Sequence, residues 1–230
     1  LGHIGLMRLA LDDHDPVKAY QSAKAALALK PNSVLAADHL FKLETDRHDW
    51  NAALPALDVI ARQQKKAKSK TAPDQLALIT RQACALHFLK AGELHESDRK
   101  SADEELLTAL KIDPGFLPAV TMLADHYLDD KAHGRAAKIL ETAFKIHPHD
   151  SIATRLKTAW KSNDGQFIAK LSKLLAQIES SQQKTAHFLV AKQARDAGLD
   201  GEAERLFSAA RDLDGGEEDT QSLWHCASCK

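Results

Sequence analysis

This chain of 230 residues has few cysteines, no long apolar run and no excess of charge of either sign. The formal net charge of −1 provides no field that would steer nucleic acid or an acidic substrate to the protein. No apolar run approaches the roughly 18 residues that a bilayer-spanning helix requires, so we predict no membrane-spanning segment within this sequence. The three cysteines, Cys84, Cys226 and Cys229, are too few for a disulfide framework and favour a reducing compartment.

The sequence also lacks the motifs of common enzyme classes. There is no glycine-rich phosphate-binding loop, and no motif marks a Ser/His/Asp or paired-carboxylate arrangement, so we do not expect an enzyme. No segment alternates apolar and polar residues as a strand does, so no sheet is expected in the repeats described below. No secretory signal is visible, and the chain begins at Leu1 rather than Met; we interpret it as a fragment of a longer protein.

What the chain does contain is a spaced pattern that recurs at least four times. Each copy has an alanine at position i, an apolar residue (alanine, leucine or phenylalanine) at i+4, an alanine at i+7 and a proline or glycine at i+12. The copies are Ala19-Ala23-Ala26-Pro31, Ala102-Leu106-Ala109-Pro114, Ala136-Leu140-Ala143-Pro148 and Ala203-Phe207-Ala210-Gly215. The first three positions share one helical face, where alanines let a neighbouring helix approach closely, and the proline ends the helix. Pro114 and Pro148 lie 34 residues apart, which is the period of the tetratricopeptide repeat.

This spacing predicts an all-α fold, namely a tetratricopeptide-repeat-like α-solenoid of about six helix–turn–helix units over residues 1–214. An acidic linker and the start of a cysteine-rich tail are predicted at 215–230. The predicted units are residues 2–31, 32–62, 74–114, 115–148, 149–181 and 182–214.

Several residues predict where individual helices begin, bend or end. Pro16 and Asp49 suit helix starts, Gly198 suits a turn between two helices, and Pro55 predicts a kink or a delayed start. A basic, polar loop is expected at 63–73. The third unit is longer than one period, and its extra residues are expected in a turn at 92–101.

In a stacked array of this kind, the first helix of each unit lines the inner face. Aligning the first, second, fourth and sixth units by their alanines places six charged residues on that face: Arg8, Asp38, Lys42, Asp125, Lys192 and Arg195. These residues are candidates for a groove that binds proteins or peptides, and a solvated face of mixed charge explains them equally well. They lack the concentrated Lys, Asn and Arg set of repeats that bind chaperone tails.

Cys226-x-x-Cys229 is the one motif with chemical content. Two thiolates at this spacing can hold one side of a tetrahedral zinc site, which needs two further ligands. We therefore predict no cofactor in this fragment and zinc in the full-length protein, with an inert pair and a redox pair as the alternatives. Cys84 lies on an apolar helix face and is predicted to be a packed core thiol.

The histidines and the basic segment each allow two interpretations. Only His147-Pro148-His149 is clustered among the 12 histidines; it lies at a helix end, where histidine can cap carbonyls, and a ligand role is the alternative. The cations at 62–70 are typical of a solvated loop, and attraction to an anionic membrane surface is the alternative. No nucleic-acid partner is expected.

Several stretches together resemble one family of repeat proteins. They are residues 5–10, Leu40-Phe41 with Asp49-Trp50, residues 113–119, residues 135–141 with Pro148-His149, and the terminal Trp224-x-Cys226-x-x-Cys229. Their order resembles the HemY-like proteins of bacterial haem biosynthesis, the repeat-containing kind, over nearly the whole chain. The second cysteine pair expected after Cys229 is missing here, which is a departure from that pattern.

The resemblance implies a repeat domain at the bacterial inner membrane, on its cytoplasmic side, with two N-terminal membrane helices that this soluble fragment lacks. We therefore expect a non-enzymatic scaffold for protein–protein interactions that is associated with haem biosynthesis. One alternative is a protein that binds haem or a porphyrin intermediate directly. Another is a repeat adaptor of lipopolysaccharide assembly, which also ends in a rubredoxin-like cysteine knuckle.

Overall fold

A computed structural model describes residues 2–66 and 72–213, and this part of the chain folds into twelve α-helices without a strand. The helices are α1 (His3–Asp12), α2 (Pro16–Leu29), α3 (Val34–Asp46), α4 (Trp50–Lys66), α5 (Ala72–Leu94), α6 (Arg99–Ile112), α7 (Leu117–Asp129), α8 (His133–Ile146), α9 (Asp150–Trp160), α10 (Asp164–Leu175), α11 (Ser180–Asp196) and α12 (Asp200–Asp212). The all-helical class predicted from the sequence is therefore confirmed.

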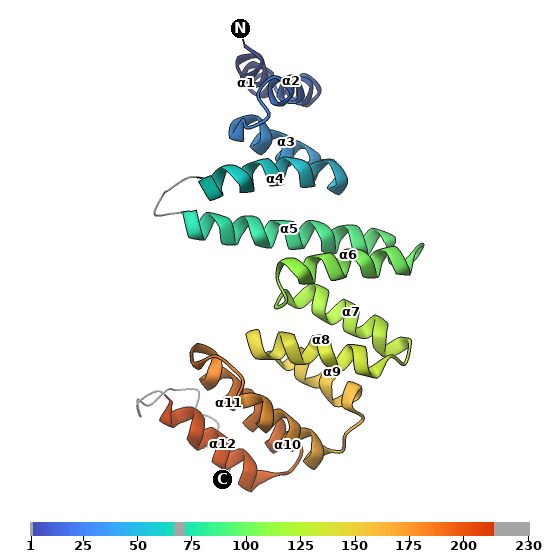
Figure 1. Ribbon diagram of the computed structural model, residues 1–230, viewed down its shortest axis with the longest axis vertical. Helices are drawn as coiled ribbons and strands as arrows, with labels where there is room; N and C mark the ends of the chain where they lie inside the picture. Colours follow the sequence, from blue (N-terminus) through green and yellow to red (C-terminus); the bar gives the residue numbers. More distant parts are fainter. Residues whose placement is uncertain (1, 67–71, 214–230) are drawn as a thin grey trace. The chain divides into compact units, whose positions relative to one another are not determined.

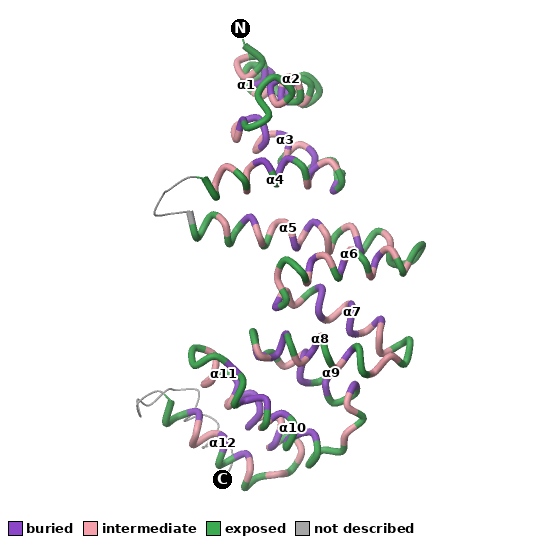
Figure 2. Tube along the Cα trace, viewed as in Figure 1, coloured by how far each residue is buried: buried purple, intermediate pink, exposed green. Residues whose placement is uncertain are grey.

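The helices divide into two compact halves, Leu1–Asp113 with α1 to α6 and Pro114–Lys230 with α7 to α12. In each half, helices that are neighbours in sequence pack on one another, as α1 with α2, α3 with α4, and α11 with α12 (Figure 1). This ordered packing is the arrangement of an α-solenoid, in which each helix finds its partners nearby in sequence. Buried residues recur along one side of the helices in both halves (Figure 2).

The repeated alanine pattern explains how the helices pack so closely. Ala109 of α6 and Ala143 of α8 are completely buried, as are Leu106 and Leu140 one turn before them. An alanine at such a position adds almost no bulk between two helix backbones, so the neighbouring helix can approach. Pro114 and Pro148 each follow the last helical residue by two positions, as predicted from their effect on helix continuation.

Five turns share one backbone geometry that the sequence pattern did not reveal. In each turn a residue adopts a left-handed conformation, and the N–H after it bonds to a carbonyl five residues back. The left-handed residues are His14, His48, Lys131, Lys161 and Gly198. This hydrogen bond is the one that closes a Schellman motif, which satisfies carbonyls left unpaired at a helix end. His14 and His48 are 34 residues apart, whereas Lys131 and Lys161 are 30 apart and Lys161 and Gly198 are 37 apart, so the turn recurs without a strict period.

Three expectations about individual segments are corrected by the structure. The predicted loop is helical at both ends, since α4 runs to Lys66 and α5 begins at Ala72, and only 67–71 lies outside the described residues. The extra length of the third unit is not in a turn at 92–101 but in α5 itself, which has 23 residues. Of the two alternatives for Pro55, a delayed start of α4 is wrong, because this helix begins at Trp50 and contains the proline in its second turn, and a kink stays a prediction.

The fifth predicted unit, residues 149–181, packs differently from its neighbours. Its two helices, α9 and α10, are both present, but α9 packs mainly on α7 and α8, and α10 mainly on α11. Trp160 at the end of α9 still meets Phe167 of α10, with ring centroids 6.1 Å apart. The irregular alanine spacing in this unit is therefore matched by a shift in helix partners.

Candidate binding face

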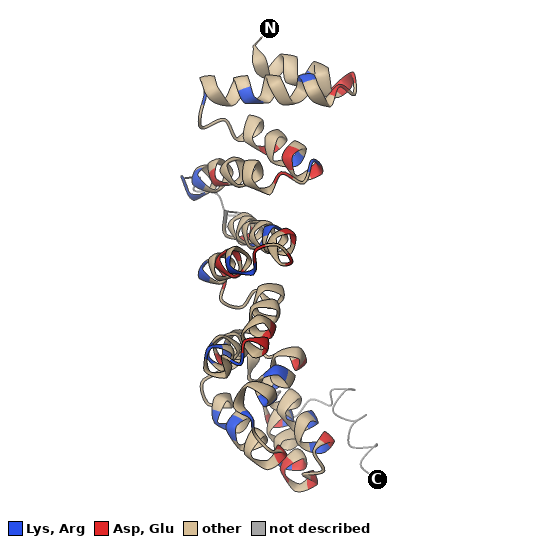
Figure 3. Ribbon diagram, turned by 90° about the vertical axis from the view of Figure 1, so that its right-hand side faces the viewer, with Lys and Arg blue, Asp and Glu red and all other residues tan. Residues whose placement is uncertain are grey.

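Charged residues of both signs are interspersed in each half of the chain, as Figure 3 shows. In the N-terminal half, Arg8 is exposed on α1. Asp38 and Lys42 lie one turn apart on α3 and form an ion pair of 2.8 Å, with Lys42 exposed and Asp38 half-buried. This is a local pair within one helix, worth only a few tenths of a kcal/mol, about 0.3–0.5. The structure therefore brings Asp38 and Lys42 together.

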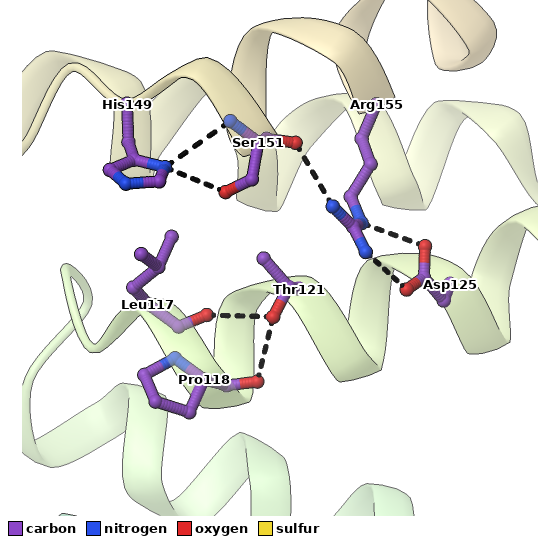
Figure 4. A network of polar contacts seen from close by, with 7 residues as sticks. All are labelled: Leu117, Pro118, Thr121, Asp125, His149, Ser151 and Arg155. Atoms are coloured by element: carbon purple, nitrogen blue, oxygen red, sulfur yellow. Dashed lines mark hydrogen bonds and ion pairs between the residues drawn. The ribbon is translucent and has the colours of Figure 1, made fainter.

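In the C-terminal half, Asp125 of α7 is held by a residue of the next odd-numbered helix. Arg155 of α9 donates through Nε to Oδ1 at 2.8 Å and through Nη2 to Oδ2 at 2.7 Å (Figure 4). Its Nη1 also donates to the backbone carbonyl of Ser151 at 3.1 Å, which fixes the guanidinium on its own helix. A two-pronged arginine–carboxylate pair of this kind is both stronger and more directional than a single contact.

Lys192 of α11 makes the next connection between odd-numbered helices. Its Nζ lies 3.1 Å from Oδ2 of Asp150, the first residue of α9. Gln193 donates to the other oxygen of the same carboxylate at 2.6 Å. Arg195, also predicted for this face, is half-buried one turn further along α11. Asp125 and Arg155 thus join α7 to α9, and Asp150, Lys192 and Gln193 join α9 to α11. These two groups of polar contacts share α9, and we name them together the α7–α9–α11 face.

Three members of this face, Asp150, Arg155 and Gln193, were missed by the reasoning from sequence. Asp150 and Arg155 belong to the fifth unit, whose alanine spacing is irregular and which was left out of the alignment that located the other residues. Their opposite charges at the start and middle of a helix expected to line the inner face were the available signal. Gln193 directly follows Lys192 and carries no charge to mark it.

Local capping fixes where α9 begins, and with it the position of Asp150. His149 precedes the helix, and its Nδ1 accepts a hydrogen bond from the backbone N–H of Ser151 at 3.2 Å (Figure 4). The expectation that this histidine cluster caps carbonyls is thus wrong for His149, which caps the N–H groups at a helix start. His147 is the C-cap residue after α8, and its backbone N–H donates to the carbonyl of Ala143 at 2.8 Å.

A second polar cluster lies between α5 and α6 in the N-terminal half. Glu105 accepts contacts from His87 Nδ1 at 2.7 Å and from Lys90 Nζ at 2.5 Å, and all three side chains are at least three-quarters buried. Burial raises the pKa of Glu105, but the hydrogen bonds from Lys90 and His87 outweigh it and hold the pKa below its ordinary value of 4.5. This cluster ties two helices together in the way a structural ion pair does.

Cys84 is completely buried in α5, as predicted for a packed core thiol. Its Sγ lies 3.5 Å from the carbonyl oxygen of Ala109 on α6. Burial raises the pKa of the Cys84 thiol to about 11, so the reactive thiolate is scarce near neutral pH. This cysteine therefore contributes to packing between α5 and α6 at an alanine of the repeated pattern.

Cys226 and Cys229 lie outside the described residues, so the predicted half-site for zinc remains a prediction. Within residues 2–66 and 72–213, no three or more His, Cys, Asp and Glu residues are grouped so as to hold a metal ion. No helix in that same part of the chain has the length and apolar character needed to cross a membrane.

No protein-family model matches the sequence, and no curated protein matches it either. The fold alone therefore defines the class of this chain, which is an array of α-helices packed in order like those of an α-solenoid.

Proposed function

We propose that this chain is a tetratricopeptide-like scaffold whose α7–α9–α11 face binds a segment of a partner protein. The 34-residue spacing, the buried alanines and the recurring left-handed turns support the repeat assignment. The observation that carries the functional proposal is the two groups of side-chain contacts that join α7 to α9 and α9 to α11.

These contacts leave the polar groups both ordered and accessible. The side chains of Asp125, Asp150 and Lys192 are 47%, 48% and 41% exposed, so each can accept a further contact from solvent or from a ligand. Because Arg155 and Gln193 already hold the two carboxylates in place, a partner need not pay the full entropy of ordering them. An extended segment with charges of both signs is the ligand that suits alternating acidic and basic groups.

A peptide library displayed on phage tests this proposal. Peptides selected on the chain are synthesised with a fluorophore, and their Kd is measured by anisotropy for the wild type and two variants, Asp150→Asn and Lys192→Met. We expect each variant to weaken binding by about tenfold or more, equivalent to about 1.4 kcal/mol. Lys138→Met, which removes an exposed charge from α8, is the matched control and should leave Kd unchanged.

Peptides that bind both variants as tightly as they bind the wild type would contradict the assignment of this face. A selection that yields no peptide better than the unselected library would contradict a peptide-binding scaffold altogether.

The relation to the HemY-like proteins remains a prediction, which rests on the stretches quoted above. Direct binding of haem is the competing function that the resemblance suggests, and an absorbance titration separates the two. A scaffold that binds only protein segments should give no saturable shift of the Soret band, whereas a haem-binding protein should give one that saturates at a fixed stoichiometry.

A further inference from the structure

A cavity of about 460 Å³ lies among α2, α3 and α4 in the N-terminal half. Its walls are mostly apolar and include Leu27 from α2, Leu40 from α3, and Ala52, Ala56 and Val59 from α4. The two alanines are small, so α4 leaves space beside α2 that a larger side chain would fill. The volume falls within the range of about 300–1,000 Å³ that is typical of sites for small molecules.

The cavity also contains a carboxylate in an unusual position. Glu44 lines it from α3 and is only 4% exposed. The backbone carbonyl of Glu44 is engaged by the N–H of Asp49 at 2.9 Å, but its carboxylate has no hydrogen-bond or ion-pair partner among residues 2–66 and 72–213. A carboxylate with so little access to solvent is poorly hydrated, and a cation that pairs with it restores part of the lost interaction.

Two cations, Lys24 and Arg62, also line the cavity, but each of them already has a contact with another side chain. Arg62 pairs with Asp58 at 3.1 Å, one turn away on α4. Lys24 and Arg47 both lie against the ring of Tyr20, at 5.3 Å and 4.9 Å from its centroid. Tyr20 itself lines the cavity, so an aromatic ring that already attracts cations borders the same space as Glu44.

We propose that this cavity binds an organic cation that carries a primary ammonium group on an apolar body. The ammonium group pairs with the carboxylate of Glu44, and the apolar body occupies the space between α2 and α4. An anion would meet the buried carboxylate with like charge, and a neutral molecule would leave that carboxylate without a partner. This site lies outside the α7–α9–α11 face, and its test is independent of the proposed function.

Three probes of the same shape and different charge test the chemistry: 4-phenylbutylammonium, 4-phenylbutanol and 4-phenylbutyrate. Their affinities are measured on the full chain by ligand-observed NMR, which suits weak binding. We expect the ammonium probe to bind at least about tenfold more tightly than the alcohol, and the carboxylate to bind most weakly. Equal binding of the three probes, or no binding of the ammonium probe, would overturn the proposal.

Two variants locate the site. Glu44→Gln keeps the shape of the side chain and removes its charge, so it should lower the affinity for the ammonium probe by at least about tenfold and leave that for the alcohol unchanged. Ala52→Leu fills the cavity and should abolish binding of both probes, whatever the effect of the first variant on folding. Glu104→Gln, an exposed carboxylate on α6, is the control and should change neither affinity. Undiminished binding of the ammonium probe to Glu44→Gln or to Ala52→Leu would refute the assignment.

Discussion

Ala143→Leu tests the central packing argument, because this alanine is completely buried in α8 between completely buried neighbours on the same helix, Leu140 and Phe144. Leucine adds three carbon atoms. If the site could accommodate them fully, their burial would stabilise the fold by roughly 2 kcal/mol, at about 0.8 kcal/mol for each methylene. Ala143, Leu140 and Phe144 have no exposed surface, so there is no room beside Ala143 for the three added carbon atoms. The expected outcome is therefore a net loss of about 1–3 kcal/mol through overpacking.

Urea denaturation followed by circular dichroism measures this change directly. Thermal unfolding should show the same effect as a fall in Tm of about 2–12 °C, given a shift of about 2–4 °C per kcal/mol for a chain of this size. Ala169→Leu is the matched control, because Ala169 is exposed in the middle of α10, and it should alter stability by less than about 0.5 kcal/mol. Ala109→Leu makes the same test independently in the N-terminal half. If Ala143→Leu and Ala109→Leu are both as stable as the wild type, the close approach of helices at these alanines is wrong.

Three further predictions follow from the turns and the ion pairs. Lys131→Gly should raise the free energy of unfolding by about 1 kcal/mol, because glycine adopts the left-handed conformation without strain. Lys138→Gly inside α8 should lower the free energy of unfolding by a similar amount, and a loss in both variants would contradict the turn geometry. A double-mutant cycle on Asp125 and Arg155 should give a coupling of about 0.5–1 kcal/mol that falls as NaCl is raised, and a coupling of zero at low salt would refute this contact. Glu105→Gln should destabilise the fold at pH 7. The difference in free energy of unfolding between this variant and the wild type should shrink as the pH falls through the folded-state pKa of Glu105, which lies below 4.5. A difference that is constant with pH would show that the charge of Glu105 contributes nothing to stability.

The sign of that pH dependence follows from the direction of the pKa shift. A carboxyl group whose pKa is lower in the folded state than in the unfolded state stabilises the fold at pH values above the unfolded-state pKa. This stabilisation is lost as the pH falls through the folded-state pKa, because the proton then binds to both states. Acid unfolding curves of the wild type and the variant should therefore converge at their acidic ends.

The contacts on the candidate face were only partly predictable from the sequence. Asp125 and Lys192 were identified because the regular units could be aligned by their alanines. Their partners Arg155 and Asp150 lie in the irregular fifth unit, where no local spacing defines the register. An ion pair between two helices depends on how those helices pack, and side chains 30 residues apart carry no mark of their pairing in a single sequence.

By itself, the sequence determined the helical class and the buried face of most helices. This was possible because alanines at i and i+7, and a proline at i+12, act through short-range sterics within one helix and its immediate neighbour. Only the tertiary structure decided which helices α9 and α10 pack against, how far α5 extends, and that Glu44 is buried beside a cavity. These three features depend on surfaces contributed by several helices at once. The left-handed conformation of Lys131 is likewise imposed by the helices that its turn connects. The local pattern thus specifies the helices, whereas their packing specifies the sites between them.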